Sequence, residues 1–264
     1  MAELSPGVAS AISPLVRRIV APNPGPLTGA GSNTYLVGVD EIVVVDPGPD
    51  DAGHVEAIVG CGGDRIRWIV LTHGHSDHAG AAAALAARTG ADVVACGAVE
   101  DGFGIEATEF RLEALRTPGH SSDSVCWLLE EERMLFSGDT VIDGSTVVIA
   151  PPDGDMAAYL ASLERLSSRR LRLRSIAPGH GALIDDPAAR LAGYLSHRLA
   201  REAEVVAALE AGAMTVDQVV DRIYVDLASA LQPAAAQTVH AHLLKLAAEG
   251  RVTGADGAWH LRAA

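Results

Sequence analysis

One short segment, LTHGHSDHAG at residues 71–80, constrains the fold of this chain more than any other. It places three histidines and an aspartate within six positions, separated only by glycine and serine. The apolar run RWIVL before it has the composition of a buried strand, so His73 and His75 come at the strand end and can point the same way. The spacing from His75 to His78 suits the first turn of a helix. Because burying four such groups unpaired would cost several kcal/mol, the pattern indicates a metal site formed where a strand meets a helix.

The segments around this motif predict an α/β arrangement. Strands are expected at YLVG and EIVVVD, a helix follows over residues 50–63, and strand 67–71 leads to helix 79–90 and strand 91–96. Strand, helix and strand in this order are typical of layered α/β folds. Further along, a hairpin is expected to turn at residues 130–132, followed by an amphipathic helix over 156–169 and a strand before APGHG.

The pattern changes after residue 186, where strands stop. Asp186 is a plausible N-cap with Pro187 at the first helical position, which predicts a long helix. Two more helical segments and a possible two-stranded ribbon near the C-terminus follow, an order typical of a winged helix. We therefore predict two domains, residues 1–190 and 191–264, with His240 and His242 on the surface of the second.

Composition narrows the location and the partners. No apolar run reaches membrane-spanning length, and no basic start with an apolar core marks secretion. Three widely spaced cysteines suit buried thiols, so we expect a cytoplasmic protein without a membrane partner. The net charge of −14 repels phosphate backbones, and residues 191–264 carry eight acidic against six basic residues. We therefore expect no DNA binding by the second domain.

The HxHxDH pattern after a strand resembles the metallo-β-lactamase superfamily. That family's pattern continues with a histidine, an aspartate and a histidine, which TPGHSSDS, LFSGDT and APGHG supply in order. The resemblance implies an αβ/βα four-layer sandwich and seven metal ligands: His73, His75 and His120 for one ion, Asp77, His78 and His180 for a second, and Asp139 as the bridge. Two Zn²⁺ per chain are expected because the ligands are nitrogen and oxygen without thiolate, and iron or manganese would fit the same set.

Longer segments resemble the beta-lactamase-like protein 2 group, in which a winged-helix-like domain follows the hydrolase domain. They include NPGPLTGAGSNTYLVG, VVDPGP and YLSHRLARE. The group implies either cleavage of single-stranded RNA or a thioesterase-like activity. In VVDPGP, Asp46 stands where the family often has an acidic residue that orients the site, and a turn aspartate before Pro47 is the alternative.

These residues predict hydrolysis by a hydroxide that bridges two zinc ions, with Asp77 and Asp139 as the catalytic carboxylates. The small apolar residues after Asp139 and the absence of arginine and lysine from the loops at 29–34, 119–124 and 143–152 favour a small ester or thioester. The alternatives are a single-strand endoribonuclease, a mononuclear-iron persulfide dioxygenase and a non-catalytic RNA-binding protein. RNA therefore stays a possible partner beside a small-molecule substrate, and the oligomeric state is left open.

Overall fold

The computed structural model describes residues 5–168 and 170–262. The chain forms two compact units. Unit 1 holds the chain up to Thr117, then Asp123–Thr146 and Ser168–Arg190. Unit 2 holds Pro118–Ser122, Val147–Ser167 and the chain from Leu191 onward. The predicted division into independent domains 1–190 and 191–264 stays a prediction, since two segments from the first half of that division belong to the second compact unit.

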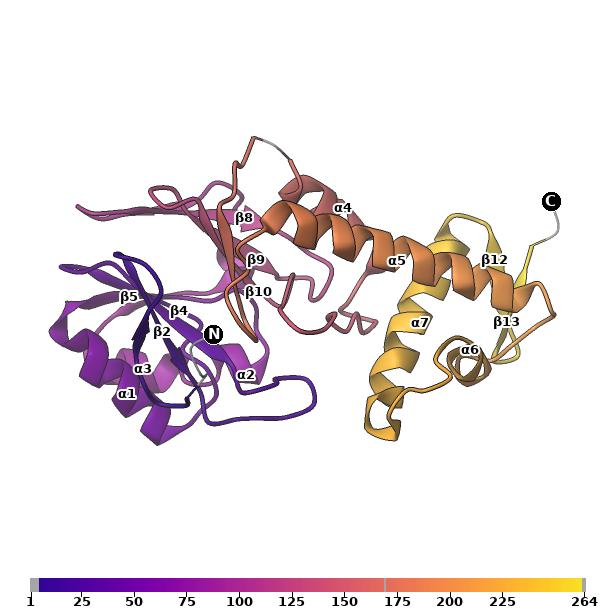
Figure 1. The fold of residues 1–264 in the computed structure, drawn as a ribbon, viewed down its shortest axis with the longest axis horizontal. Helices are drawn as coiled ribbons and strands as arrows, with labels where there is room; N and C mark the ends of the chain where they lie inside the picture. The colour runs from indigo at the N-terminus through magenta and orange to yellow at the C-terminus, as the bar shows by residue number, and fades with distance from the viewer. Residues whose placement is uncertain (1–4, 169, 263–264) are drawn as a thin grey trace. The chain divides into compact units, whose positions relative to one another are not determined.

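The first sheet of unit 1 has six strands in sequence order. They are β1 (Ser10–Ala11), β2 (Val16–Val20), β3 (Asn33–Val37), β4 (Ile42–Val45), β5 (Ile66–Val70) and β6 (Asp92–Val94). The first four pair antiparallel, and β4, β5 and β6 run parallel. Helices α1 (Ala52–Gly62) and α3 (Ala82–Thr89) connect the parallel strands and lie on the same side of this sheet (Figure 1). Strands β3 and β4 are buried along their whole length, as expected for strands covered on both faces.

The second sheet of unit 1 has the order β11, β10, β9, β8, β7. Its strands are β7 (Gly104–Glu106), β8 (Arg111–Arg116), β9 (Val125–Leu129), β10 (Met134–Gly138) and β11 (Ser175–Pro178). Only β10 and β11 pair in parallel. One hydrophobic core contains side chains of both sheets, and the rings of Tyr35 and Phe136 meet across it with centroids 5.1 Å apart. The two sheets therefore face each other around a shared core.

Polar residues follow the carboxyl ends of two of the parallel strand pairs, β4 with β5 and β10 with β11. Asp46 comes directly after β4, and the segment beginning at His73 comes shortly after β5. Asp139 follows β10 directly, and His180 lies two residues beyond β11. Strand β10 and its neighbour β9 are fully buried, which fixes the position of the strand end. The fold thus collects these side chains at strand ends without a long loop.

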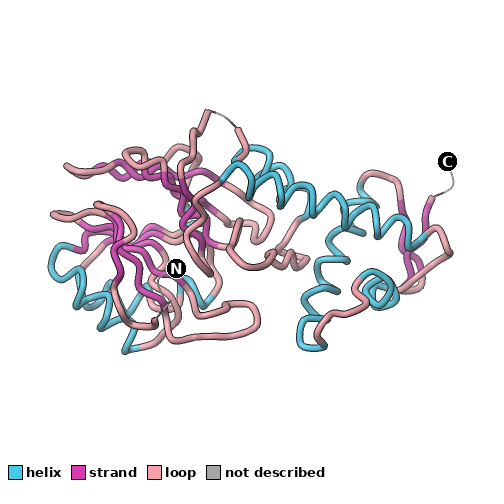
Figure 2. The backbone as a smooth tube through the Cα atoms, viewed as in Figure 1, coloured by secondary structure: helices cyan, strands magenta, loops and turns pink. Residues whose placement is uncertain are grey.

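Unit 2 is mostly helical, with one strand pair among its described residues (Figure 2). It comprises α4 (Met156–Leu166), most of α5 (Pro187–Leu209), α6 (Val216–Ile223), α7 (Gln232–Ala248) and the antiparallel pair β12 (Val252–Ala255) and β13 (Ala258–Leu261). Thr215 and Gln218 form a capping box that starts α6. Val205, Val219, Val239 and Leu243 belong to a second hydrophobic core. No helix in the described ranges is long and apolar enough to cross a bilayer.

The elements differ from the sequence-based expectations in several places. The helix expected over 79–90 is divided into α2 (Ser76–Ala79) and α3, and the chain passes close to a neighbouring loop at Gly80, between the two. A side chain there would come within 2.8 Å of the backbone nitrogen of Asp50. Strands β1, β2 and β7 were not anticipated. The start of α5 is as expected, since the Asp186 carboxylate accepts a hydrogen bond from the Ala189 amide at 3.0 Å.

Candidate metal centre

Four side chains from three separate segments converge at the strand ends of unit 1. The atoms that meet are Oδ2 of Asp77, Nε2 of His78, Oδ1 of Asp139 and Nε2 of His180. Nε2 of His78 lies 3.5 Å from the Asp77 oxygen, 3.4 Å from the Asp139 oxygen and 3.3 Å from Nε2 of His180. Nε2 of His180 lies 3.3 Å from the Asp77 oxygen and 3.4 Å from the Asp139 oxygen.

These five distances fit a tetrahedral ion. Four ligands bound at about 2.1 Å in a tetrahedron stand about 3.4 Å from one another, which is the separation of zinc ligands of the nitrogen and oxygen type. Five of the six edges of such a tetrahedron are therefore present at the expected length. The donor set and its spacing fit a divalent cation of this kind.

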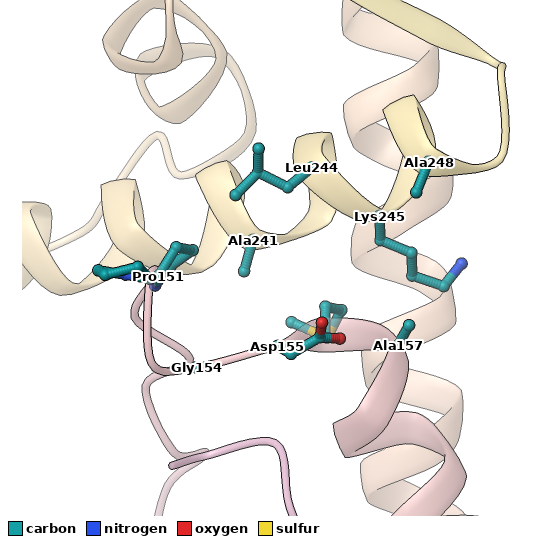
Figure 3. Close-up of a pocket in the computed structure, with 10 residues that line it drawn as sticks. Pro151, Gly154, Asp155, Ala157, Ala241, Leu244, Lys245 and Ala248 are labelled. Carbon is teal, nitrogen blue, oxygen red and sulfur yellow. The ribbon is translucent and has the colours of Figure 1, made fainter. Parts of the chain in front are cut away.

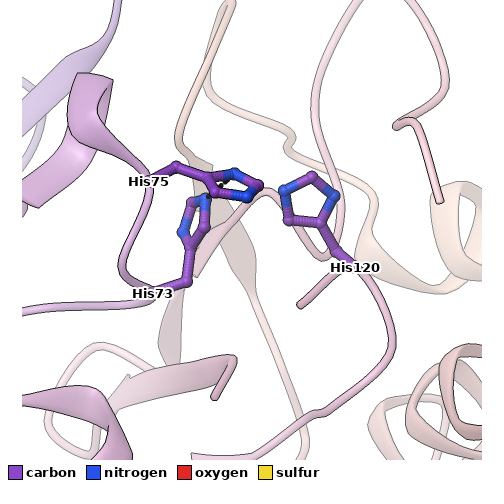
Figure 4. Close-up of side chains that lie close together, drawn as sticks. All are labelled: His73, His75 and His120. Atoms are coloured by element: carbon purple, nitrogen blue, oxygen red, sulfur yellow. Dashed lines mark hydrogen bonds between the residues drawn. The ribbon is translucent and has the colours of Figure 1, made fainter. Parts of the chain in front are cut away.

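A second group of donors consists of three histidines whose rings point toward one another (Figure 4). One ring nitrogen each of His73, His75 and His120 lies within 4.8 Å of the others, and Nε2 of His73 is 3.0 Å from Nδ1 of His75. His120 comes from a loop whose base is closed within unit 1 by a 2.9 Å hydrogen bond from the Thr117 amide to the Ser124 carbonyl. The three rings can therefore share one cation.

Neighbouring acceptors determine which ring nitrogens are available. A carbonyl oxygen can only accept, so His120 carries its proton on Nδ1, which lies 2.8 Å from the Val148 carbonyl, and presents Nε2. The Thr72 hydroxyl donates to the Asp46 carboxylate at 2.6 Å and therefore accepts from Nδ1 of His73 at 3.1 Å. His73 also presents Nε2. Such partners fix the tautomer of metal-binding histidines.

Asp46 orients His78 in the same way. Its Oδ2 lies 2.9 Å from Nδ1 of His78, which leaves Nε2 of that ring for the four-atom cluster. The same carboxylate accepts hydrogen bonds from the amide and the hydroxyl of Thr72 at 2.7 and 2.6 Å. Because its oxygens are already used by these donors, Asp46 holds a ligand in place rather than serving as one. Asp46 also lies in a turn, with φ 50°. The two interpretations of VVDPGP, a residue that orients the site and a turn aspartate before Pro47, therefore both describe it.

Two glycines make room for the cluster. A side chain at Gly179 would lie 2.6 Å from the His78 ring and 2.7 Å from the Asp139 carboxylate. A side chain at Gly138, where φ is 47°, would lie 2.2 Å from the Thr72 hydroxyl. Neither contact is sterically possible, so the SGD and PGH segments need glycine beside the ligands that they carry.

The side chains of the four-atom cluster shift one another's pKa values. Burial disfavours a charged His78, but Asp139 and Asp46 outweigh it and hold the pKa of His78 well above its ordinary value. Burial acts against a charged His180 too, and hydrogen bonds to Asp139 and Asp77 raise its pKa to about 9. The two histidines in turn hold the pKa values of Asp77 and Asp139 below their usual range, against the effect of burial. The carboxylates therefore stay ionised and attract positive charge.

Comparison with known proteins agrees with this geometry. The sequence matches the family model of the metallo-beta-lactamase superfamily over residues 27–100 and 97–180, and that of the beta-lactamase associated winged helix domain over 215–259. It is 32% identical to the beta-lactamase-like protein 2 homolog of Caenorhabditis elegans, covering 91% of this chain and 87% of that protein.

The chain belongs to the metallo-beta-lactamase superfamily. It is also 31% identical to an atrochrysone carboxyl ACP thioesterase of Cryptosporiopsis sp., covering 91% of this chain and 82% of the relative. Among solved structures, a beta-lactamase domain protein from Burkholderia ambifaria superposes with a TM-score of 0.83 at 21% identity, covering 99% of this chain and 96% of the other. The expected fold, a metallo-β-lactamase α/β sandwich followed by a winged-helix domain, is confirmed.

All seven predicted ligands of this superfamily member lie in the two groups described above. The sequence did not show what holds them: the Thr72 hydroxyl, the Val148 carbonyl, and Ser32, whose hydroxyl lies 3.4 Å from the Asp77 carboxylate. Thr72 directly precedes the motif, so its role in holding a ligand could have been predicted from the sequence. A backbone carbonyl 28 positions from its histidine leaves no signal in the sequence.

Unit 2 contains a separate pocket of about 310 Å³ (Figure 3). Its walls are mainly apolar, with Pro151, Ala241 and Leu244 among them, and the adjacent Lys245 ammonium is bound by Glu202 and Glu249 at 2.8 and 2.7 Å. None of the metal-ligating groups found in the described ranges lies there. The prediction that His242 is a surface residue is wrong, because its ring is 1% exposed between helices of this unit.

Proposed function

We propose that this hydrolase holds two Zn²⁺ ions and cleaves an ester or thioester bond of a small molecule. The observation that carries the proposal is the set of five donor separations of 3.3–3.5 Å among Asp77, His78, Asp139 and His180. His73, His75 and His120 would hold the other ion, and Asp139 would be shared by both. Zinc bound there would supply a Lewis acid and lower the pKa of water to about 7.

The chain's own groups keep this site ready for catalysis. Asp77 and Asp139 remain ionised at neutral pH, as their lowered pKa values require. The Asp77 carboxylate accepts a hydrogen bond from the Ser32 hydroxyl at 3.4 Å, which restricts the rotation of the carboxylate. Asp46, Thr72 and the Val148 carbonyl hold protons on the ring nitrogens that face away from the donor clusters. We assign Asp77 and Asp139 as the catalytic carboxylates on these grounds.

Three observations favour an acyl substrate over a phosphodiester. Several relatives over 30% identical are named ACP thioesterases. Phosphate backbones are bound by exposed arginine and lysine, yet Arg190, which reaches the 143–152 loop, is held by the Asp143 carboxylate at 2.6 Å. The overall charge of −14 acts in the same direction. The three cysteines, all described, form no disulfide, and two of them are buried, which supports our placement of the protein in the cytoplasm.

The test compares substrates on protein loaded with a known amount of metal. Metal analysis should give about two zinc ions per chain, and a short acyl thioester should turn over faster than single-stranded RNA. Measurements at low and moderate salt separate the two classes, because RNA cleavage through phosphate contacts falls steeply with salt. RNA cleavage with that salt dependence and no thioester turnover would reject the proposed substrate, and one iron per chain would reject the proposed metal.

A further inference from the structure

His54 is a buried histidine that belongs to neither ligand group. It lies near the start of α1, where the Asp51 carboxylate accepts a hydrogen bond from its amide at 2.7 Å. Its ring is 1% exposed and reaches the strand ends of the first sheet, with Nε2 2.8 Å from the hydroxyl of Thr34. That hydroxyl lies 2.6 Å from the backbone carbonyl of Asp46. A hydrogen-bonded chain therefore leads from His54 to the residue that orients His78.

The direction of each hydrogen bond follows from the groups involved. The Asp46 carbonyl can only accept, so the single proton of the Thr34 hydroxyl points to it. Thr34 must then accept from His54, which carries its proton on Nε2. Burial lowers the pKa of His54 to about 4, so the ring is neutral near pH 7. Nδ1 of His54 has no hydrogen-bond partner within the described ranges, which is unfavourable for a buried polar atom.

The turn at Asp46 needs support of this kind. At φ 50° its backbone is in the left-handed region, which is strained for a residue other than glycine. The same turn holds His78 at two points, through the Asp46 carboxylate at 2.9 Å and through the Gly48 amide, which donates to the His78 carbonyl at 3.0 Å.

The ring of His54 also packs directly under Gly48. A side chain added at Gly48 would come within 2.9 Å of that ring. His54 therefore supports the turn at the two residues that hold His78. It packs directly against Gly48, and it is linked to Asp46 through the Thr34 hydroxyl. Any shift of the turn would move both contacts that hold His78.

We infer that Thr34 and His54 are positioning residues for the metal ligand His78: they fix the turn at residues 46–48 and thereby direct Nε2 of His78 toward Asp77, Asp139 and His180. Neither residue touches the reacting atoms. The inference rests on the metal assignment of the proposed function. It predicts that removing this support weakens the site containing His78 more than the site of His73, His75 and His120, which the turn reaches only through Thr72.

Two pairs of variants test it. Thr34→Val keeps the shape of the side chain but removes the hydroxyl, and Thr34→Ser keeps the hydroxyl. His54→Leu removes the donor, and His54→Gln restores an N–H near the position of Nε2. Thr89→Val is the matched control, because it removes a hydroxyl that donates to a backbone carbonyl, Leu85 at 2.8 Å, at the end of α3. Thermal unfolding of each metal-free variant checks that it is folded.

Stepwise zinc titration against a chromophoric chelator measures the two sites separately. Thr34→Val and His54→Leu should weaken one of the two steps by roughly 10–100-fold, the usual effect of losing a group that holds a ligand. Thr34→Ser, His54→Gln and Thr89→Val should stay near the wild-type affinity. Equal losses in Thr34→Ser and Thr34→Val, or wild-type binding by Thr34→Val and His54→Leu, would overturn the inference.

A second readout needs no metal. Nitrogen-15 spectra of the metal-free protein should show a hydrogen-bonded Nδ1 proton on His78, and this signal should shift or broaden in Thr34→Val and return in Thr34→Ser. An unchanged His78 signal in both removal variants would reject the positioning role. If the wild-type protein binds no zinc while the His78 signal responds as expected, the proposed function fails and the positioning role stands.

Discussion

Two regions of the molecule bury a carboxylate among nitrogen bases, and they do so for different ends. In unit 1, Asp77 and Asp139 face the rings of His78 and His180 at 3.3–3.5 Å. In unit 2, Glu202 on α5 is bound by the ammonium of Lys245 at 2.8 Å and by the guanidinium of Arg251 at 3.1 Å. Both clusters combine buried acidic oxygens with nitrogen.

The difference is whether the nitrogen can give up its proton. An imidazole has a lone pair to offer once it is neutral, so the unit 1 cluster can replace its protons by a cation. Lysine and arginine stay protonated and have no lone pair for a metal. The unit 2 cluster is therefore neutralised by its own side chains. Because Arg251 and Lys245 are used in this way, they are less available to a phosphate backbone, which supports our expectation that the domain does not read DNA.

The largest expected effect comes from Asp139→Ala, which tests whether the unit 1 cluster depends on a shared carboxylate. Two ions would lose a common ligand, so we expect fewer than two zinc ions per chain and an activity loss beyond the roughly 100-fold typical of residues that only support a ligand. Metal analysis and steady-state kinetics measure the two effects. Asp64→Ala is the matched control, since Asp64 is exposed elsewhere in unit 1. Retention of two tightly bound ions in Asp139→Ala would show that no carboxylate is shared.

Acid should affect the unit 2 cluster in a defined range. The nearby His242 ring and the Lys245 ammonium outweigh burial and lower the pKa of Glu202 from 4.5 to about 2. A carboxyl group with a lowered folded-state pKa stabilises the fold above its unfolded-state pKa, and this contribution is lost as pH falls from about 4.5 to about 2. The shift corresponds to at most about 3 kcal/mol in the free energy of unfolding. Urea titrations at pH 7, 4 and 3 measure it.

The variant Glu202→Gln separates this group from the others. The amide does not ionise, so the difference in unfolding free energy between wild type and variant should shrink as pH falls through the same range. Zinc binding at the candidate metal centre should be unchanged at pH 7. A difference that stays constant between pH 7 and pH 3 would show that Glu202 is not the group that titrates.

The contrast between the two clusters also explains what could be predicted from sequence. Four ligands of unit 1 lie within six consecutive positions. A metal site could be predicted there because a strand end and a helix start fix the directions of their side chains. The Glu202 cluster joins α5, α7 and the residue before β12, so no local pattern marks it. His242 was misjudged for this reason, since the sequence of α7 does not show that Glu202 lies 3.6 Å from its ring.

The same limit applies inside the predicted site. The residue types and their spacing were enough to predict the ligands. The orientation of each ligand, however, depends on hydrogen-bond partners that are distant in the chain. Thr34 and His54 lie 12 and 8 positions from Asp46, on a strand and a helix whose packing the sequence does not specify. Patterns thus revealed which atoms could bind a cation, and only the structure showed which groups hold them.

Asp46→Asn sharpens the comparison at a smaller scale. The amide keeps the size of the side chain and tolerates the left-handed backbone, but it removes the negative charge beside Nδ1 of His78. We expect roughly 10–100-fold weaker zinc binding at the His78 site, by the same titration against a chelator. Wild-type affinity for both ions would mean that Asp46 serves only the turn.

The smallest effect is expected at Asp256, which has nearly the same backbone conformation as Asp46, with φ 52° against 50°. Asp256 and Gly257 form the exposed turn between β12 and β13, and both have positive φ, as two-residue hairpin turns with Asn-Gly or Asp-Gly require. Asp256→Asn makes the same chemical change as Asp46→Asn in a place where the carboxylate is exposed to solvent. It should alter the unfolding free energy by no more than about 0.5 kcal/mol and leave zinc affinity unchanged. Thermal unfolding and the zinc titration measure both quantities.

If Asp46→Asn and Asp256→Asn both had small effects on unfolding free energy and zinc affinity, the left-handed backbone alone would explain the aspartate at both positions. A large effect at Asp46 only would assign the difference to what its carboxylate contacts.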